Sequence, residues 1–242
     1  MQPTLTTLSL WRQQLGEVPE SVWRRTELQV LILADNGLTD LPSKIGGLHR
    51  LTTLDLGHNK LTSLPHALGD LAELSGCLYL HDNDLSRLPD TLGNLTRLRY
   101  LNVGENPLTA LPETIGRMTE LVELRAQHSR LTTLPAGIGC LHKLRELWLR
   151  GNKLTSLPNS TTQLHELRHL DLRENAVNEL PEVLKCLPRL RQLDLRTNRI
   201  VQLPDWVAQM PSLEKLDLRW NPCTLSPHLL TELEQRGCVV LL

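Results

Sequence analysis

Leucine recurs along the whole chain in the pattern LxxLxLxxNxL. In the unit that begins at Leu51, the pattern continues through Leu54, Leu56, Asn59 and Leu61. Successive units begin 23 residues apart, with a single spacing of 24, at Leu5, Leu28, Leu51, Leu74, Leu98, Leu121, Leu144, Leu167, Leu190 and Leu213. A fixed period of this length is typical of repeat architectures, in which each unit packs on its neighbours. We therefore expect a stack of units rather than one irregular core.

Each unit predicts a short strand followed by a bend. Leu54 and Leu56 alternate with Asp55, so a strand here points both leucines into the core and Asp55 to the opposite face. An asparagine follows at the bend, where its amide can satisfy backbone groups that the turning chain leaves unpaired. Stacked units would align these side chains in a ladder made of Asn36, Asn59, Asn83, Asn106, Asn152, Asn175, Asn198 and Asn221.

The second part of each unit predicts a helical turn. Leu-Pro follows the asparagine in most units, and a stretch of the form xxIGxL comes next. Ile45 and Leu48 lie three residues apart in this stretch, on one face of a short helical turn, and proline suits a helix start. The unit that begins at Leu74 carries one extra residue, for which we expect a bulge or loop adjustment near Gly76.

The composition agrees with one packing solution used many times. The 242 residues include 58 leucines and no phenylalanine, and aromatic residues make up only 3% of the chain. An ordinary core fills irregular space with mixed aliphatic and aromatic side chains. A core made almost entirely of leucine indicates the same narrow slot in every unit.

These units resemble the leucine-rich repeats of intracellular proteins. The match is to the 23-residue class with the ending LPxxIGxL, found in Ras-group-related repeat proteins of animals and plants and in many bacterial repeat proteins. The resemblance implies an α/β repeat solenoid, a horseshoe with a parallel concave β-sheet and short helical or extended turns on the convex side. Such arrays are mostly protein-binding frameworks, often attached to a kinase, GTPase or ubiquitin-ligase domain.

We expect a single leucine-rich-repeat domain with capped ends. Its expected parts, within residues 1–242, are a degenerate N-terminal capping repeat at 1–27, regular repeats at 28–221 and a C-terminal helix-strand cap at 222–242. The first repeat has Gln13 at the asparagine position and polar residues such as Gln2 on its outer face. In the last part, Ser226 starts a helix that runs to Gln235, and residues 238–242 form a final strand.

Five of the seven aromatic residues fall at or beside the predicted concave positions: Trp11, Tyr79, Tyr100, Trp148 and Trp220. Neighbouring strands lie about 4.8 Å apart, so three of these belong to one patch. The expected patch comprises Tyr79, His81, Tyr100, Asn102, Arg125, His128 and Trp148. Aromatic side chains beside arginine are typical of protein-binding hot spots, which is the interpretation we favour over a simple covering of the sheet. Ala126 and Ser129 break the repeat pattern nearby, through either function or drift.

A column of arginines follows the patch along the sheet. It consists of Arg150, Arg173, Arg196 and Arg219, flanked by Asp171, Asp194 and Asp217. We expect each arginine to reach an aspartate on its own strand or the next. Two interpretations remain open: a mutually neutralised ladder on a solvated sheet, or a docking strip that orients a charged partner.

Other kinds of chemistry find little support. The formal net charge of -1 argues against nucleic-acid binding, and no apolar stretch approaches the length of a membrane span. The five cysteines show no zinc-like spacing, which favours a reduced compartment. His58, His81, His128 and His169 lie near acidic residues on the concave side. An open sheet excludes water poorly, so we expect no catalytic residue, metal or cofactor.

The sequence therefore predicts a non-catalytic interaction module, a cytoplasmic monomer that binds a protein partner on its concave face. The leading alternative is the substrate-targeting arm of a signalling enzyme or effector, of ubiquitin-ligase or kinase type, whose catalytic domain lies elsewhere. Such an effector would be delivered to a host cell. An engineered array is a third alternative, although the variable surface columns favour a natural binding surface.

Overall fold

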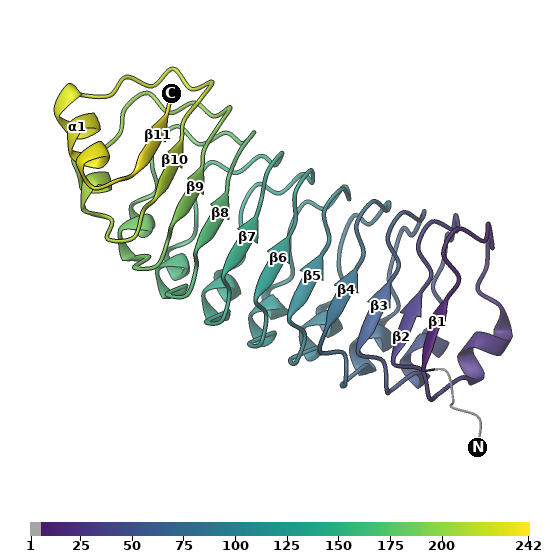
Figure 1. The fold of residues 1–242 in the computed structure, drawn as a ribbon. Helices are drawn as coiled ribbons and strands as arrows, with labels where there is room; N and C mark the ends of the chain where they lie inside the picture. The colour runs from purple at the N-terminus through teal and green to yellow at the C-terminus, as the bar shows by residue number, and fades with distance from the viewer. Residues whose placement is uncertain (1–5) are drawn as a thin grey trace.

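The computed structural model describes residues 6–242 and shows an arc of stacked units (Figure 1). Its strands form one parallel sheet whose order follows the chain from β1 to β11, as expected for a repeat solenoid. The strands are β1 (Thr7–Ser9), β2 (Val30–Ile32), β3 (Thr53–Asp55), β4 (Cys77–Tyr79), β5 (Tyr100–Asn102), β6 (Glu123–Arg125), β7 (Glu146–Trp148), β8 (His169–Asp171), β9 (Gln192–Asp194), β10 (Lys215–Asp217) and β11 (Val239–Leu241). Gln2 and Leu5, named above as parts of the first repeat, lie outside the described residues.

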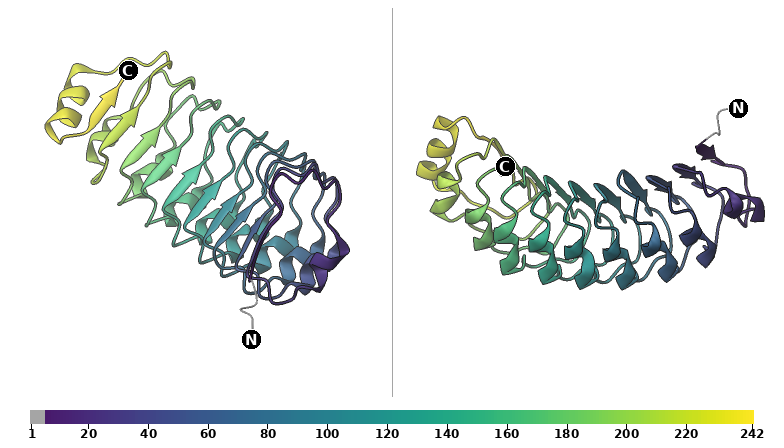
Figure 2. Two further views of the ribbon diagram at one scale, coloured as in Figure 1. Left: turned by 45° about the vertical axis from the view of Figure 1, so that its right-hand side comes forward. Right: turned by 90° about the horizontal axis from the view of Figure 1, so that it is seen from below.

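Short 3-10 helices line the convex side of the arc, opposite the sheet (Figure 2). They are η1 (Glu20–Arg24), η2 (Ser43–Gly47), η3 (His66–Asp70), η4 (Asp90–Asn94), η5 (Glu113–Arg117), η6 (Ala136–Cys140), η7 (Asn159–Gln163), η8 (Glu182–Cys186) and η9 (Asp205–Gln209). Each follows a proline, and Pro65 for example is extended, with φ -68° and ψ 145°. The expected helical turns are present, and proline stands just before each helix because its fixed φ suits this junction.

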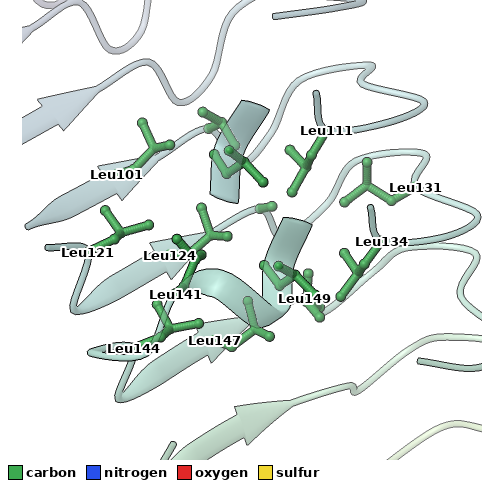
Figure 3. Close-up of a cluster of buried hydrophobic side chains, with 14 of the residues drawn as sticks. Leu101, Leu111, Leu121, Leu124, Leu131, Leu134, Leu141, Leu144, Leu147 and Leu149 are labelled. Carbon is green, nitrogen blue, oxygen red and sulfur yellow. The ribbon is translucent and has the colours of Figure 1, made fainter. Parts of the chain in front are cut away.

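The core is a set of leucine rows that run across the units. Leu101, Leu124 and Leu147 are paired in register on β5, β6 and β7 and are fully buried (Figure 3). Because every unit presents the same slot, the same side chain fills it each time, which accounts for the excess of leucine.

All eight predicted ladder asparagines hold buried backbone groups. Asn106 Nδ2 donates to the carbonyl oxygens of Leu80 and Val103, at 2.9 and 3.1 Å, and its Oδ1 accepts from Leu85 N at 3.0 Å. The other seven make equivalent bonds. Ser129 occupies this position in one unit, and its buried hydroxyl has no hydrogen-bond partner.

Glycine permits close stacking of the convex turns. A Cβ at Gly69 would lie 2.2 Å from Thr91 O in the next turn, and the equivalent glycines from Gly46 to Gly139 are similarly crowded. From η7 onward the glycine position holds Thr162, Lys185 or Ala208, and η8 packs less closely on η9 than the turns from η2 to η7 pack on each other.

The extra residue near Gly76 is absorbed at the start of β4, as expected. There β3 and β4 share only two paired positions, whereas other neighbouring strands share three. A Cβ at Gly76 would lie 2.8 Å from Thr53 Oγ1, so this site needs glycine. The adjustment stays local, because Asp55 and Tyr79 are again in register.

The predicted helix of the last unit is α1 (Pro227–Gln235), capped by Ser226 Oγ, which accepts from Leu229 N at 3.2 Å. Gly237 follows with a φ of +79°, and β11 then pairs with β10. The helix packs against η9 and β11.

Candidate protein-binding face

The strand register aligns four residues of the expected patch in one column. Tyr79, Asn102, Arg125 and Trp148 are successive partners across β4 to β7. Tyr100 lies in the neighbouring column, two residues before Asn102, together with His169 on β8. The parallel, in-register sheet therefore brings residues that are about 23 positions apart in sequence to adjacent places on one face.

Five side chains from this face form one continuous strip, which we call the aromatic strip: Tyr79, Tyr100, Arg125, Trp148 and His169. The rings of Tyr79 and Tyr100 have centroids 5.0 Å apart. The Arg125 guanidinium lies 5.8 Å from the Tyr100 ring and 5.0 Å from the Trp148 ring. His169 stacks on Trp148, with ring centroids 4.2 Å apart. The expected patch does not include His169, although its position in the repeat is the same as that of Tyr100.

Two glutamates hold the strip in place. Arg125 Nε donates to Glu123 Oε1 at 2.5 Å, and Trp148 Nε1 donates to Glu146 Oε2 at 3.2 Å. Burial, followed by the nearby Cys77, raises the pKa of Tyr79 to about 12.

His81 extends the strip at its N-terminal end, with its ring 6.0 Å from that of Tyr79 and 4.6 Å from that of His58. Burial and then the neighbouring His58 lower the pKa of His81. His128 is exposed, and its ring covers Gly151, where a Cβ would lie 2.5 Å from His128 Nδ1.

Asn102, which the sequence also places in the patch, is only 6% exposed. Its Oδ1 accepts from Gly104 N at 3.1 Å, which holds the chain as it leaves β5. Asp55 does the same for Gly57 N at 2.9 Å. A short polar side chain at this position therefore ties down the backbone, and Asn102 presents little surface to a partner.

The arginine column is only partly paired as predicted. Arg196 contacts Asp194 at 2.5 Å and Asp217 at 3.4 Å, and Arg219 contacts Asp217 at 2.7 Å. Arg150 and Arg173 instead share Glu174, at 2.9 and 3.6 Å.

Asp171 does not ion-pair with Arg173, although the sequence places it beside that arginine. Its Oδ1 accepts from Arg173 N at 2.9 Å. Burial, followed by the charge of Asp194, raises the pKa of Asp171 to about 6.

A hollow of about 420 Å³ lies where the aromatic strip meets the arginine column. Trp148 and His169 line it together with Arg150, Arg173 and other charged side chains. The remaining tryptophans on this side, Trp11 and Trp220, are 54% and 68% exposed. The face thus offers aromatic surface and charge side by side.

Comparison with known proteins agrees with this architecture. The family description "Leucine-rich repeat region" matches residues 77–152 and 136–236, and "Leucine Rich repeats (2 copies)" matches residues 26–72. The chain belongs to the leucine-rich-repeat family. Domains of this family are typically non-enzymatic interaction modules. None of the curated proteins matches the chain significantly.

Several solved leucine-rich-repeat structures are similar to this repeat protein. One, from Leptospira interrogans, has 31% identity and a TM-score of 0.74, with 93% of this chain and 69% of that chain covered. The ectodomain of the Arabidopsis thaliana receptor kinase GASSHO1/SCHENGEN3, in complex with CASPARIAN STRIP INTEGRITY FACTOR 2, has 31% identity and a TM-score of 0.78, with coverages of 93% and 28%. The plant peptide hormone receptor RGFR1, in complex with RGF2, has 26% identity and a TM-score of 0.62, with coverages of 97% and 46%.

The structure of this leucine-rich-repeat chain adds two further findings, both for residues 6–242. No helix in that range is long and apolar enough to cross a membrane. No group of three or more histidine, cysteine, aspartate or glutamate side chains there is arranged to hold a metal ion.

Proposed function

We propose that this protein is a non-catalytic interaction module that binds a protein or peptide partner on its concave face. The observation that carries the proposal is the unbroken contact of Tyr79, Tyr100, Arg125, Trp148 and His169, all of them partly exposed. Binding hot spots are enriched in tyrosine, tryptophan and arginine, and the two aromatic side chains bury large surface at low entropic cost. The complexes of the two plant receptors support the general mode of action.

The strip is better suited to binding than to covering the sheet. Glu123 and Glu146 orient Arg125 and Trp148 in the free protein, so a partner would meet side chains that are already ordered. Ordered contact residues lose less conformational entropy on association. We therefore assign the anchoring role to the strip.

The arginine column would orient the partner. Asp194 and Asp217 neutralise Arg196 and Arg219, whereas Arg150 and Arg173 share the single carboxylate of Glu174. An acidic group on the partner would supply a second carboxylate for Arg150 and Arg173. Exposed charges of this kind act more on the rate of association than on affinity.

The chain's subclass and setting are also proposals. The 23-residue spacing and the LPxxIGxL ending support the Ras-group-related or bacterial class. All five cysteines are free thiols, which supports a reducing, cytoplasmic environment and a monomer without disulfide links. An arm that targets a separate catalytic domain would use the same concave face, and a longer native reading frame would support that role.

The test is a triple variant, Tyr79→Ala, Tyr100→Ala and Trp148→Ala, in an affinity pull-down. We expect it to fold, since these side chains lie outside the leucine rows, and to lose the partner that the wild type captures. Trp206→Ala, an aromatic change on the convex η9, is the matched control and should retain capture. Capture by a folded triple variant would disprove the strip as the anchor.

A further inference from the structure

Two histidines at the N-terminal end of the concave face point at each other. His58 Nε2 and His81 Nε2 are 3.2 Å apart, and the two rings meet edge to face at 80°. His58 comes just after β3, and His81 comes just after β4. The contact therefore joins two neighbouring units.

A carboxylate fixes the tautomer of the first ring. His58 Nδ1 lies 2.6 Å from Asp82 Oδ2, and it must donate because the carboxylate can only accept. In the neutral form of His58 that donates from Nδ1, the lone pair is on Nε2, where it can accept a hydrogen bond from His81 Nε2. A carboxylate bonded to the far nitrogen is also the usual device that orients a metal-ligating histidine.

The backbone and one glycine hold the pair in position. His58 N donates to His81 O at 3.0 Å, and the ladder residue Asn83 also donates to His81 O at 3.3 Å. The His81 ring lies against Gly57, where a Cβ would come within 2.5 Å of its Cε1 atom. The absence of a side chain at Gly57 thus makes room for the ring beside His58.

We propose that His58 and His81 form a two-histidine site for a divalent transition-metal ion of the Zn²⁺ or Ni²⁺ class. With metal-nitrogen bonds of about 2.0–2.1 Å, two ligands of one ion lie about 3.0–3.4 Å apart. The Nε2 atoms already have that separation, and imidazole is a preferred ligand of these ions. The ion replaces the hydrogen shared by the two nitrogens, and His81 then carries its proton on Nδ1.

The remaining coordination positions belong to water, because no third protein ligand joins the group within residues 6–242. His81 Nδ1 is buried without a hydrogen-bond partner. Moving the proton of His81 to this atom leaves a buried donor unsatisfied, and that cost opposes metal binding. We therefore expect weaker binding than at a four-ligand structural site. The water positions face the concave side, where a donor from a bound partner could replace them.

The repeat supplies a matched control within the chain. His128 occupies the position of His58 in a later unit, just before the ladder position, and it has the same left-handed backbone, with φ of 50° against 54°. The residue that corresponds to His81 in the following unit is Arg150. His128 therefore lacks a second imidazole and should not form an equivalent site.

Calorimetric titration of the full chain with Zn²⁺, repeated with Ni²⁺, tests the proposal. We expect one saturable site in the wild type and in His128→Ala, and its loss in His58→Ala and in His81→Ala. Asp82→Asn should weaken binding roughly 10- to 100-fold, as measured for other carboxylates behind metal ligands. Gly57→Ala should also weaken it, because the new methyl group displaces the His81 ring while the leucine core is unchanged.

A spectroscopic measurement distinguishes metal binding at His58 and His81 from binding at other histidines. The electron paramagnetic resonance spectrum of the chain with one equivalent of Cu²⁺ should show nitrogen hyperfine coupling that His58→Ala reduces. Circular dichroism must show that each variant is folded. A wild type without saturable binding, or a His58→Ala variant that binds Zn²⁺ as the wild type does, would overturn the proposal.

Discussion

Trp148 and His169 stack on each other, with ring centroids 4.2 Å apart and planes inclined by 30°. They come from neighbouring strands, β7 and β8, and from neighbouring columns of the concave face. This contact links the aromatic strip to the hollow beside the arginine column. A partner that binds here would therefore contact aromatic rings and charged side chains at the same place.

The first prediction concerns this stack and uses the partner recovered in the pull-down. Trp148→Ala should lower affinity by about 2 kcal/mol, roughly 30-fold, because it removes the largest ring of the strip. His169→Ala should cost about 0.5–1.5 kcal/mol, since it removes only the supporting ring. Calorimetry on both single variants and the double variant measures these losses. Equal losses for the two single changes would contradict the assigned roles.

The second prediction concerns the gap in the asparagine ladder. Ser129→Asn should raise the free energy of unfolding by about 1–2 kcal/mol, because the amide can bond to buried backbone groups as Asn106 and Asn152 do. Urea denaturation of the variant and the wild type measures the change. The reverse change at a filled position, Asn106→Ser, should destabilise the chain. A loss of stability in Ser129→Asn would show that the backbone around position 129 leaves no room for the larger amide side chain.

The third prediction concerns the pH dependence of stability at Asp171. Because its pKa is about 6 in the folded protein, against 3.8 ordinarily, the folded state binds the proton more tightly than the unfolded state does. This group therefore destabilises the protein at pH 7, and the effect is relieved as the pH falls from 6 toward 4.

Asp171→Asn should remove that dependence and stabilise the protein at pH 7 by about 1–2 kcal/mol. Asn102 already fills the equivalent position and accepts the equivalent backbone bond, so the amide fits. Thermal unfolding at pH 4.5 and pH 7 measures both effects. If the two proteins differ equally at both pH values, Asp171 does not titrate in this range.

The fourth prediction concerns the close stacking of the convex turns. Gly69→Ala should destabilise the protein by about 1–3 kcal/mol, because the methyl group would lie 2.2 Å from the backbone oxygen of Thr91. Gly47→Ala is the matched control, since a Cβ there has no neighbour within 4 Å. The control should be neutral or slightly stabilising, because alanine restricts the unfolded chain more than glycine does. Similar urea midpoints for the two variants would show that the turns can separate without cost.

Much of the architecture could be predicted because the same pattern of leucine and asparagine positions recurs in nearly every unit. The alternation at Leu54 and Leu56 fixes which face of the strand is buried, and Asn59 marks the bend. The exposed aromatics could be predicted too, because the leucine rows leave few places for large rings in the core. The low aromatic content, together with the places of Tyr79 and Trp148 in the repeat, therefore indicated that these two side chains are partly exposed.

The contacts between side chains of different units could not be predicted in the same way. Asn102 was assigned to the binding face, yet its short amide bends back to Gly104 N. Arg150 and Arg173 turn to Glu174, whereas Arg196 and Arg219 pair with Asp194 and Asp217.

The sequence by itself determined the period, the parallel strands and the ladder, because a pattern repeated along the chain admits one way of stacking. The tertiary structure decided which neighbours meet on the concave face. His58 reaches His81 only because Gly57 leaves room for the second ring and Asp82 orients the first. Such contacts depend on the directions of side chains about 23 residues apart, and only the folded array sets those directions.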